Sequence, residues 1–508
     1  MDSAHLASRG LASPGSMESI SPVGSLAERN TPWKLFLPVS RRGTALAVNL
    51  KKRDLIRLGR SFGEVHIAGV TRVQDAKEAS EEAGGRGGVS RFAPLDILPA
   101  LGDVYTAIAV DVDNNKSSIS PERIIQLLKP GGAAIWVGGR GARPTSLDIA
   151  RFEKESFRRY ALLPPDTRKI ALPLEGTGWS RSGLEMFFPL RRKNRMILRM
   201  CHLTAAVGCQ ALLGVKQIVV ARKGGVLTDG EYFLEWLRRK FDPRVAEVTI
   251  YSGWTRIVFQ LMDADANVLG FAKVADTVLG RKGNERETGA LESLKVIQSF
   301  QGAVPEILMK AEWEGHSVQI QGSVGTAGKK YSYELLPPHF NFLGDLALVG
   351  RRDLSLEQWP DWQRFLRFVS DEKIPNRREA EALHRVLERS MKDLAGRKIP
   401  FHRTHGDFTP WHVLLAQGRV SVVDWERSEP IGLPFFDIAY FQLNRMGHLD
   451  KGGKPEGTDG IHPVLLPGGT EPYERLAGRI GVSPGIARLA VIYAYAVSKH
   501  LDLLMDPA

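Results

Sequence analysis

Hydrophobic positions in the N-terminal part of the chain come in short runs separated by helix-like stretches, from about residue 33 to residue 223. The stretch ISPERIIQLLKPGG (119–132) predicts a helix with Ser120 as N-cap, Pro121 in the first turn and a stop at Pro130-Gly131-Gly132. Alternating strands and helices predict an α/β domain with a parallel sheet. The runs that predict its strands are VHIAGV (65–70), YTAIAVDVD (105–113), AAIWVGG (133–139) and QIVVARK (217–223).

The pattern changes after residues 224–243, a linker-like stretch that holds one predicted helix. Residues 246–276 predict three antiparallel strands with turns at YSGW (251–254) and DADAN (263–267). A strand-rich half followed by a helical half is typical of an α+β unit. Its other predicted elements are two strands within 304–323 and helices over 284–300, 355–372, 376–396 and 484–505.

These patterns divide the 508 residues into five parts. Residues 1–30 are rich in Ser, Gly, Ala and Pro and are predicted to be disordered. The other predicted parts are an α/β domain (31–223), a linker (224–243), a strand-rich lobe (244–325) and a helical lobe (326–508).

Composition and charge narrow the class of partner. With 43% hydrophobic and 25% charged residues, the chain resembles ordinary globular proteins. The net charge of +12 favours anionic partners such as nucleotides, nucleic acid or a membrane surface. The basic residues are spread along the chain and are not interleaved with aromatic ones. We therefore expect no nucleic-acid partner.

The two cysteines, Cys201 and Cys209, form no C-x-x-C pair, which argues against a zinc framework or a disulfide scaffold and favours a reducing compartment. The N-terminus lacks the basic start and apolar region of a signal peptide. The longest uncharged run, 200–215, is too short and too polar to span a bilayer. We expect a cytoplasmic protein without an integral membrane segment. The oligomeric state stays open.

The candidate chemistry lies in HGDFTPWHVLLAQGRVSVVDWE (405–426), where Asp407 and Asp424 lie at the edges of apolar runs with His412 between them. Upstream, Lys273 lies on a predicted strand and Glu287 on the next helix. Taken singly, these residues are compatible with a turn cap, a solvated strand end and a solvent-facing lysine. Their order fits phosphoryl transfer from ATP, which needs a cationic clamp, magnesium and a carboxylate to orient the acceptor hydroxyl.

Three motifs carry a family resemblance: HGDFTPWH (405–412), VVDWE (422–426) and PFFDIAYF (434–441). They resemble the H-G-D-x-x-x-x-N, Asp-Trp and Pro-x-x-D-[LI]-A motifs of aminoglycoside phosphotransferases and choline kinase-like proteins, relatives of protein kinases. The resemblance covers about residues 244–508. It implies a bilobal protein-kinase-like fold and an ATP-dependent phosphotransferase. The acceptor would be a hydroxyl of a small molecule such as an aminoglycoside, an amino alcohol or a sugar.

The resemblance assigns roles in the helical lobe. Asp407 matches the catalytic aspartate, which acts as base toward the acceptor hydroxyl. Asp424 matches the metal-binding aspartate, whose oxygens suit magnesium. His405 and Asp437 are expected to support the catalytic loop without reacting themselves.

In the strand-rich lobe, Lys273 matches the lysine that holds the ATP phosphates. Glu287 is the best candidate for its partner, and Glu285, two residues away, is the rival. Gly253 matches the remnant of a glycine-rich phosphate loop.

His412 departs from the family pattern, which has a magnesium-binding asparagine at this position. An imidazole nitrogen binds magnesium poorly and transition metals well. Three outcomes stay open: activity with one magnesium ion on Asp424, a site that prefers manganese and includes His412, or a pseudokinase that binds nucleotide without turnover.

The N-terminal part resembles, through LLKPGG (127–132), the late part of class I S-adenosylmethionine-dependent methyltransferases, a Rossmann-like fold. The glycine-rich turn and the acidic residue at the end of the second strand, which would hold the cofactor, are not evident; GRSFGEVHIAG (59–69) lacks the G-x-G spacing. We predict a degenerate domain. The alternative is a bifunctional protein that also transfers methyl groups from S-adenosylmethionine.

Overall fold

The computed structural model describes residues 217–449 and 470–499, apart from 229, 254, 276, 325–329 and 371–376. Before residue 217 it describes the stretches 40–50, 62–68, 88–92, 104–111, 121–138, 157–163 and 170–185, with single positions at 37, 55, 58, 196, 200, 203 and 204. The segment predicted to be disordered, and both cysteines, lie outside the described residues.

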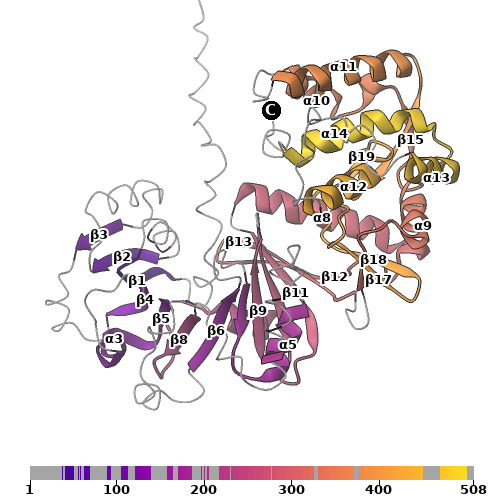
Figure 1. Ribbon diagram of the computed structural model, residues 1–508. Coiled ribbons are helices and arrows are strands. Elements are labelled where there is room, and N and C mark those ends of the chain that lie inside the picture. The colour runs from indigo at the N-terminus through magenta and orange to yellow at the C-terminus, as the bar shows by residue number, and fades with distance from the viewer. Residues whose placement is uncertain are drawn as a thin grey trace, which may run out of the picture.

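Five parallel strands form the N-terminal part of the sheet, in the order β3-β2-β1-β4-β5. This is the doubly wound order, whose switch point lies between β1 and β4 (Figure 1). The mixed α/β character is therefore as expected. The strands are β1 (Ser40–Val48), β2 (Phe62–Ala68), β3 (Gly88–Phe92), β4 (Tyr105–Asp111) and β5 (Leu128–Gly138).

Three details of the N-terminal prediction are wrong. The strands at Ser40–Val48, Gly88–Phe92, Phe157–Leu163 and Ile170–Pro173 were not predicted. The sheet is not wholly parallel, because β8 (Gln217–Arg222) is antiparallel to β5, and β6 (Phe157–Leu163) is antiparallel to β8. Helix α3 (Pro121–Leu127) ends before the predicted stop, and Pro130-Gly131-Gly132 lie inside β5. Gly131 has a φ of 73° and its N–H donates to Lys223 O, so the backbone bends there without ending the strand.

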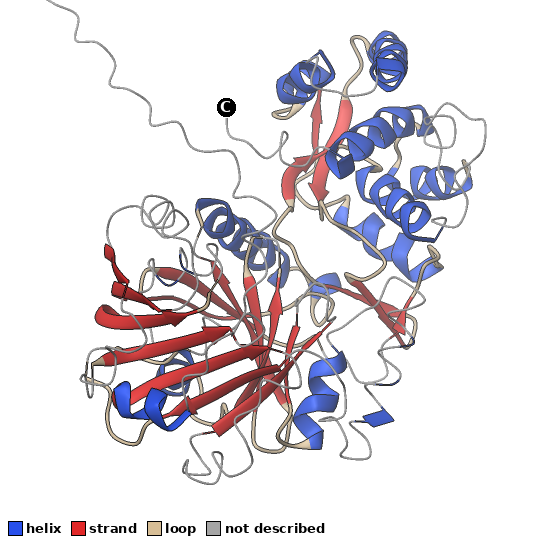
Figure 2. Ribbon diagram, turned by 60° about the vertical axis from the view of Figure 1, so that its left-hand side comes forward, coloured by secondary structure: helices blue, strands red, loops and turns tan. Residues whose placement is uncertain are grey.

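The N-terminal sheet continues into the strand-rich lobe without a break (Figure 2). β7 (Ile170–Pro173) pairs with β6 on one side and with β9 on the other. The five strands predicted in this lobe are confirmed and antiparallel. They are β9 (Glu247–Ser252), β10 (Ile257–Met262), β11 (Val268–Ala275), β12 (Ile307–Trp313) and β13 (His316–Gln321).

One hydrophobic cluster runs along a single face of this sheet, from Ala45 on β1 to Ile320 on β13. Helix α7 (Phe233–Lys240), within the predicted linker, packs Phe233 onto Phe259 and Trp313 in that cluster. Helix α5 (Thr177–Glu185) contacts β7 and β9. The predicted domain boundaries stay a prediction, but they do not coincide with an edge of the sheet.

Helix α8 (Val278–Lys295) follows β11 and carries Glu287. It begins six residues before the predicted helix, because Thr277 caps it by accepting a hydrogen bond from Gly280 N. The rest of the chain is mainly helical and forms a second core, with Trp359, Trp362 and Trp425 fully buried. Figure 1 shows these helices above the strand-rich lobe.

The helices of this part are α9 (Pro337–Leu346), α10 (Trp362–Ser370), α11 (Arg377–Leu394), α12 (Phe436–Leu449), α13 (Glu471–Ile480) and α14 (Ala487–Lys499). Two small sheets complete it: β14 (Lys330–Tyr331), β17 (Val413–Ala416) and β18 (Arg419–Val422); and β15 (Arg352–Leu354), β16 (Ile399–Thr404) and β19 (Glu429–Gly432).

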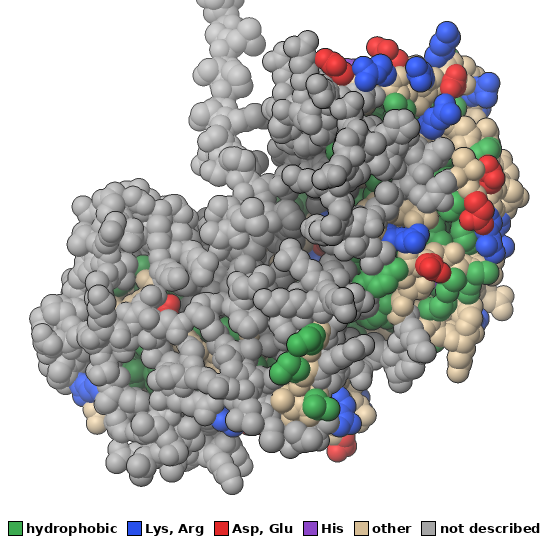
Figure 3. All heavy atoms as spheres, in the orientation of Figure 1, with side chains coloured by type: hydrophobic (Ala, Val, Ile, Leu, Met, Phe, Trp, Pro, Cys, Tyr) green, Lys and Arg blue, Asp and Glu red, His purple; other side chains and the backbone are tan. Residues whose placement is uncertain are grey.

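On the face in Figure 3, basic and acidic side chains are intermixed over the helical part and do not separate into patches of one sign. Among the described residues, no helix combines the length and the apolar character needed to cross a bilayer.

Candidate active site

A lysine on β11 and a glutamate on α8 form a buried ion pair. Lys273 Nζ lies 2.6 Å from Glu287 Oε1, and the Glu287 side chain has no exposed area. Burial raises the pKa of Glu287, but Lys273 and Arg256 more than offset this, so the net shift is downward and the carboxylate is charged. The rival, Glu285, is exposed on another face of α8.

The loop after β16 presents Asp407. Gly406, with a φ of 81°, leaves no room for a side chain, because a Cβ there would overlap the carbonyl of Arg427. The backbone N–H groups of His405 and Gly406 donate to the two oxygens of Asp437, at 2.9 and 3.0 Å. Asp437, at the start of α12, therefore holds the loop by its backbone.

Burial raises the pKa of Asp437 to about 7, while the two backbone donors oppose the shift. His405 is also buried, and burial, followed by repulsion from His412, lowers its pKa to about 4. The His405 ring is therefore neutral: Nδ1 accepts from Asp407 N at 3.2 Å, and Nε2 donates to Val423 O at 3.1 Å. Both residues position the loop.

Asp424 follows β18 by two residues and has a φ of 69°, a left-handed conformation that aspartate tolerates better than most residues. Its Oδ1 lies 3.0 Å from Lys273 Nζ and 2.8 Å from Arg256 Nη2. Burial opposes ionisation, but Lys273, Arg256 and His412 together hold the pKa of Asp424 well below its usual range.

His412 lies between the two aspartates. Its Nδ1 is 3.0 Å from the Asp407 carbonyl and 3.6 Å from Asp407 Oδ2, and its Nε2 is 3.6 Å from Asp424 Oδ2. The structure thus brings together Lys273, Glu287, Asp424, His412 and Asp407, as the sequence predicts for a shared site. Their chemical roles stay predictions.

Arg256, which sequence reasoning missed, is the most connected residue of the site. It lies in the turn after Gly253. A Cβ at position 253 would lie only 2.8 Å from the carbonyl oxygen of Arg256, so this close turn favours glycine. Its guanidinium, only 4% exposed, contacts Glu287 Oε2 at 2.5 Å, Asp424 and Glu426 Oε2 at 2.9 Å. The three carboxylates outweigh burial and raise the pKa of Arg256. The only signal in the sequence was its position next to the predicted phosphate loop.

Arg427 was also missed. Its Nη1 lies 3.7 Å from Asp407 Oδ2 and donates to the Tyr440 hydroxyl at 3.1 Å. Burial disfavours the charged guanidinium, but the Asp407 carboxylate outweighs it, so the pKa of Arg427 is raised. A cation therefore lies beside the carboxylate that is predicted to accept a proton.

The donor chemistry of the site fits a magnesium ion through Asp424 alone. Its Oδ1 is bound by two cations, and its Oδ2 lies 3.6 Å from His412 Nε2. Across the described residues, no group of three or more His, Cys, Asp or Glu side chains is arranged to hold a metal ion. His412 offers nitrogen, which suits manganese better than magnesium.

A strand lysine paired with a helix glutamate, facing a two-aspartate loop segment, is the arrangement of kinase-like phosphotransferases. Comparison by sequence agrees: residues 319–454 match the model of the phosphotransferase enzyme family, so the C-terminal region of the chain is related to that family. No curated protein matches the sequence.

Solved structures of phosphotransferases and of methyltransferases match parts of the chain weakly. A ternary complex of aminoglycoside phosphotransferase APH(4)-Ia with ADP and hygromycin B has 15% identity over 53% of this chain and 92% of its own, with a TM-score of 0.34. APH(3'')-Id from Streptomyces rimosus has 15% identity over 54% and 98%, with a TM-score of 0.30. A proposed sarcosine dimethylglycine methyltransferase from Galdieria sulphuraria has 14% identity over 37% and 80%, with a TM-score of 0.20.

Arg256→Met is expected to lower the free energy of unfolding by about 3 kcal/mol or more, because it leaves Glu287 and Glu426 short of a buried counter-charge. Urea denaturation followed by tryptophan fluorescence measures the change. The matched control is Lys310→Met, which breaks an exposed pair with Glu292 and should cost no more than about 1 kcal/mol. Equal losses in the two variants would contradict the assigned role of Arg256.

Proposed function

We propose that the C-terminal half of this protein is an ATP-dependent phosphotransferase that transfers the γ-phosphate to a hydroxyl of a small molecule. The observation that carries the proposal is the meeting of Lys273, Glu287 and Asp424, with Asp424 3.6 Å from the histidine that bridges to Asp407. The match of residues 319–454 to the phosphotransferase family supports it.

In this proposal Asp407 accepts a hydrogen bond from the acceptor hydroxyl and takes its proton as the new P–O bond forms. The bond between the γ-phosphorus and the β,γ-bridging oxygen of ATP breaks in the same step, and ADP leaves with that oxygen. Arg427 stabilises the Asp407 carboxylate and helps to aim it. Lys273, held by Glu287, contacts the phosphates of ATP next to the Gly253 turn. His405 and Asp437 position the loop, as their backbone contacts support.

Asp424 is the residue that would hold a magnesium ion, which neutralises phosphate charge when bound. Arg256 lies on Asp424 Oδ1 and already supplies a positive charge at this position. It must therefore share Asp424 with the ion or turn toward the phosphates, whose charge a guanidinium binds well. Aminoglycosides, amino alcohols and sugars are the acceptor classes that the family resemblance suggests.

Asp407→Asn is expected to lower the rate of phosphoryl transfer about 100-fold or more, because an amide cannot take the proton. ADP release is measured with aminoglycosides, choline, ethanolamine, homoserine and sugars as acceptors, and ATP affinity should stay unchanged. Asp345→Asn, which removes an acid 38% exposed on α9, is the matched control. If Asp407→Asn turned over at the wild-type rate, Asp407 would not be the base.

A second candidate, a nucleotide-binding module without turnover, is favoured by two observations. Arg256 neutralises the predicted metal-binding aspartate, and a histidine replaces the family asparagine. The Arg256 charge lessens the need for magnesium at Asp424, and the histidine removes an oxygen ligand that would help to bind it. ATP binding without ADP release for any acceptor would support this alternative over the enzyme.

His412→Asn separates the two candidates by metal preference. A carbonyl oxygen in place of nitrogen should shift the preference from manganese toward magnesium by about tenfold or more. The ratio of the manganese and magnesium dissociation constants, measured with ATP present, reports this shift alongside ADP release. His384→Asn on α11 is the control. An unchanged ratio would place His412 outside any metal site.

The N-terminal strand order favours a nucleotide-type ligand at the switch point between β1 and β4, the arrangement behind the bifunctional alternative. The resemblance to methyltransferases places the expected cofactor residues directly after the first and the second strand. Residues 49–58, after β1, contain no glycine, and residues 69–74, after β2, contain no acid. We therefore propose that this part is a degenerate methyltransferase-like unit.

S-adenosylmethionine at 100 times a typical dissociation constant would stabilise a binding protein by about 2.7 kcal/mol. We expect no shift in the unfolding temperature of the full chain, because residues 49–58, directly after β1, contain no glycine that would let the backbone approach the ligand. Methionine is the control ligand, and ATP is the positive comparison. A clear shift with S-adenosylmethionine would favour the bifunctional alternative.

A further inference from the structure

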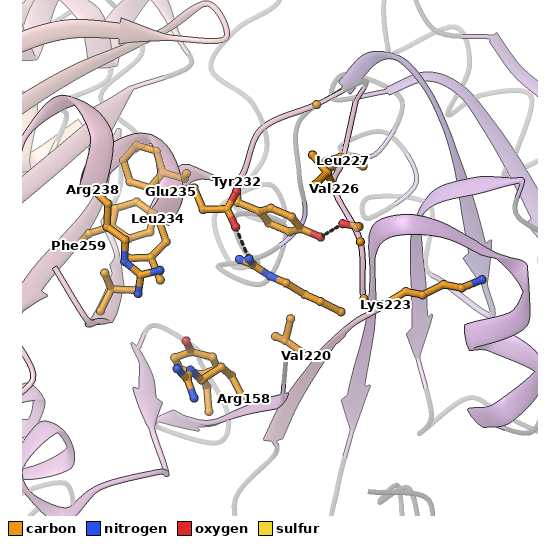
Figure 4. A pocket seen from close by; sticks show the side chains of 18 residues that line it. Arg158, Val220, Lys223, Val226, Leu227, Tyr232, Leu234, Glu235, Arg238 and Phe259 are labelled. Atoms are coloured by element: carbon orange, nitrogen blue, oxygen red, sulfur yellow. Dashed lines mark hydrogen bonds and ion pairs between the residues drawn. The ribbon is translucent and has the colours of Figure 1, made fainter. Parts of the chain in front are cut away.

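A cavity of about 540 Å³ lies where the N-terminal strands meet the strand-rich lobe (Figure 4). Tyr160 on β6, Val220 on β8, Val248 on β9 and Phe259 on β10 line it from the sheet, and residues 223–227, 230 and 232–235 complete its wall. Its volume is in the range of small-molecule sites.

The cavity is separate from the phosphotransfer site. In the antiparallel pairing, Phe259 lies opposite Ala272, while Val258 lies opposite Lys273. Because successive side chains of a strand point to opposite faces, Phe259 and Lys273 lie on opposite faces of the sheet. A ligand in the cavity therefore does not compete with ATP at Lys273.

Positive charge gathers in this cavity. Of the charged residues described in its wall, four are cationic and one is acidic: Arg158, Arg222, Lys223, Arg238 and Glu235. Lys223 points away from the cavity in Figure 4, and its Nζ donates to Leu128 O at 2.7 Å, so the three arginines supply the positive charge. Glu235 is paired with Arg222 at 2.5 Å. Burial, followed by repulsion from Arg222, lowers the pKa of Arg238, as expected of cations held together with too little negative charge.

The acid nearest to Arg158 does not remove this excess. Glu247 Oε2 is 3.5 Å from Arg158 Nε, and its side chain has no exposed area. Burial raises the pKa of Glu247, although Val248 N and the Tyr160 hydroxyl donate to its other oxygen. Even a fully charged Glu247 leaves more positive than negative groups around the cavity. The Arg158 side chain is 37% exposed and accessible to a ligand.

The cationic groups are held in place. The Arg222 guanidinium stacks 3.4 Å from the centre of the Tyr232 ring, and the Tyr232 hydroxyl donates to Gly131 O at 2.8 Å. Arg238 donates to the carbonyls of Val245 and Ala246 at 2.6 and 3.1 Å. Little side-chain entropy is left to lose on binding an anion.

We propose that this cavity binds a small organic anion other than ATP. Its carboxylate, sulfonate or phosphate group contacts Arg158 and Arg238, and its apolar part packs on Val220, Val248 and Phe259. Figure 4 shows Arg158, Arg238, Val220 and Phe259 around the same space. The proposal does not depend on phosphoryl transfer in the other site.

The probe is anilinonaphthalene sulfonate, an aromatic anion whose fluorescence rises in an apolar site. It is titrated into the full-length wild type and three variants. Two of them are expected to have opposite effects, and the third is a conservative replacement. Arg158→Gln removes one cation and should weaken binding about tenfold. Glu235→Gln releases Arg222 from its partner and should tighten binding. Arg158→Lys keeps the charge and should restore part of the loss.

The matched controls lie outside the cavity: Arg181→Gln on α5, exposed, and Glu292→Gln on α8, 53% exposed. Neither should change the affinity for the probe. ATP with magnesium should not displace the probe, and circular dichroism checks that each variant is folded. Equal affinity in wild type and Arg158→Gln, equal losses in Arg158→Gln and Arg181→Gln, or displacement by ATP would each overturn the proposal.

Discussion

The candidate active site depends on how the negative charge of one buried carboxylate, Glu287, is neutralised. Glu287 has no exposed side-chain area, so its charge requires partners within the protein. Lys273 supplies one from β11, Arg256 supplies another from the turn after β9, and Trp425 N donates to it from the helical part. A single side chain thereby fixes the rotation of α8 and connects both lobes. Without it, Lys273 and Arg256 would share only Asp424, which lies outside the strand-rich lobe.

Arg256 adds a second positive charge at Asp424. Two cations, Lys273 and Arg256, share Asp424 Oδ1, and Arg256 also reaches Glu426. A carboxylate that is already neutralised has less to gain from a metal ion than a free one does. The same contacts join the turn of the strand-rich lobe to the helical part. The contacts that neutralise Asp424 are therefore the same contacts that hold the two lobes together at this site.

The continuous sheet gives the protein two separate surfaces for chemistry. One face carries Lys273 toward α8 and the catalytic loop, and the other face lines the cavity with Phe259 and Val248. Because β7 joins β9, the cavity is built by strands from both predicted domains. The predicted linker therefore contains a helix, α7, that packs Phe233, Trp236 and Leu237 into the hydrophobic cluster of the sheet.

The sequence by itself determined the five strands and helix α8 of the strand-rich part, because their periodicity and turns are local properties. Of the helices described in the helical part, it predicted α10, α11 and α14 but not α9, α12 or α13. It also determined the motifs around Asp407, Asp424 and Asp437, since these residues are close along the chain. It did not show β1, whose apolar half is short, nor the antiparallel direction of β8. Arg256 and the cationic cavity were decided only by the tertiary structure. The Arg256 cluster joins Arg256 to Asp424, and the cavity is lined by residues from Gly131 to Phe259. Residues so distant in sequence meet only when the chain packs, so no local pattern predicts these contacts.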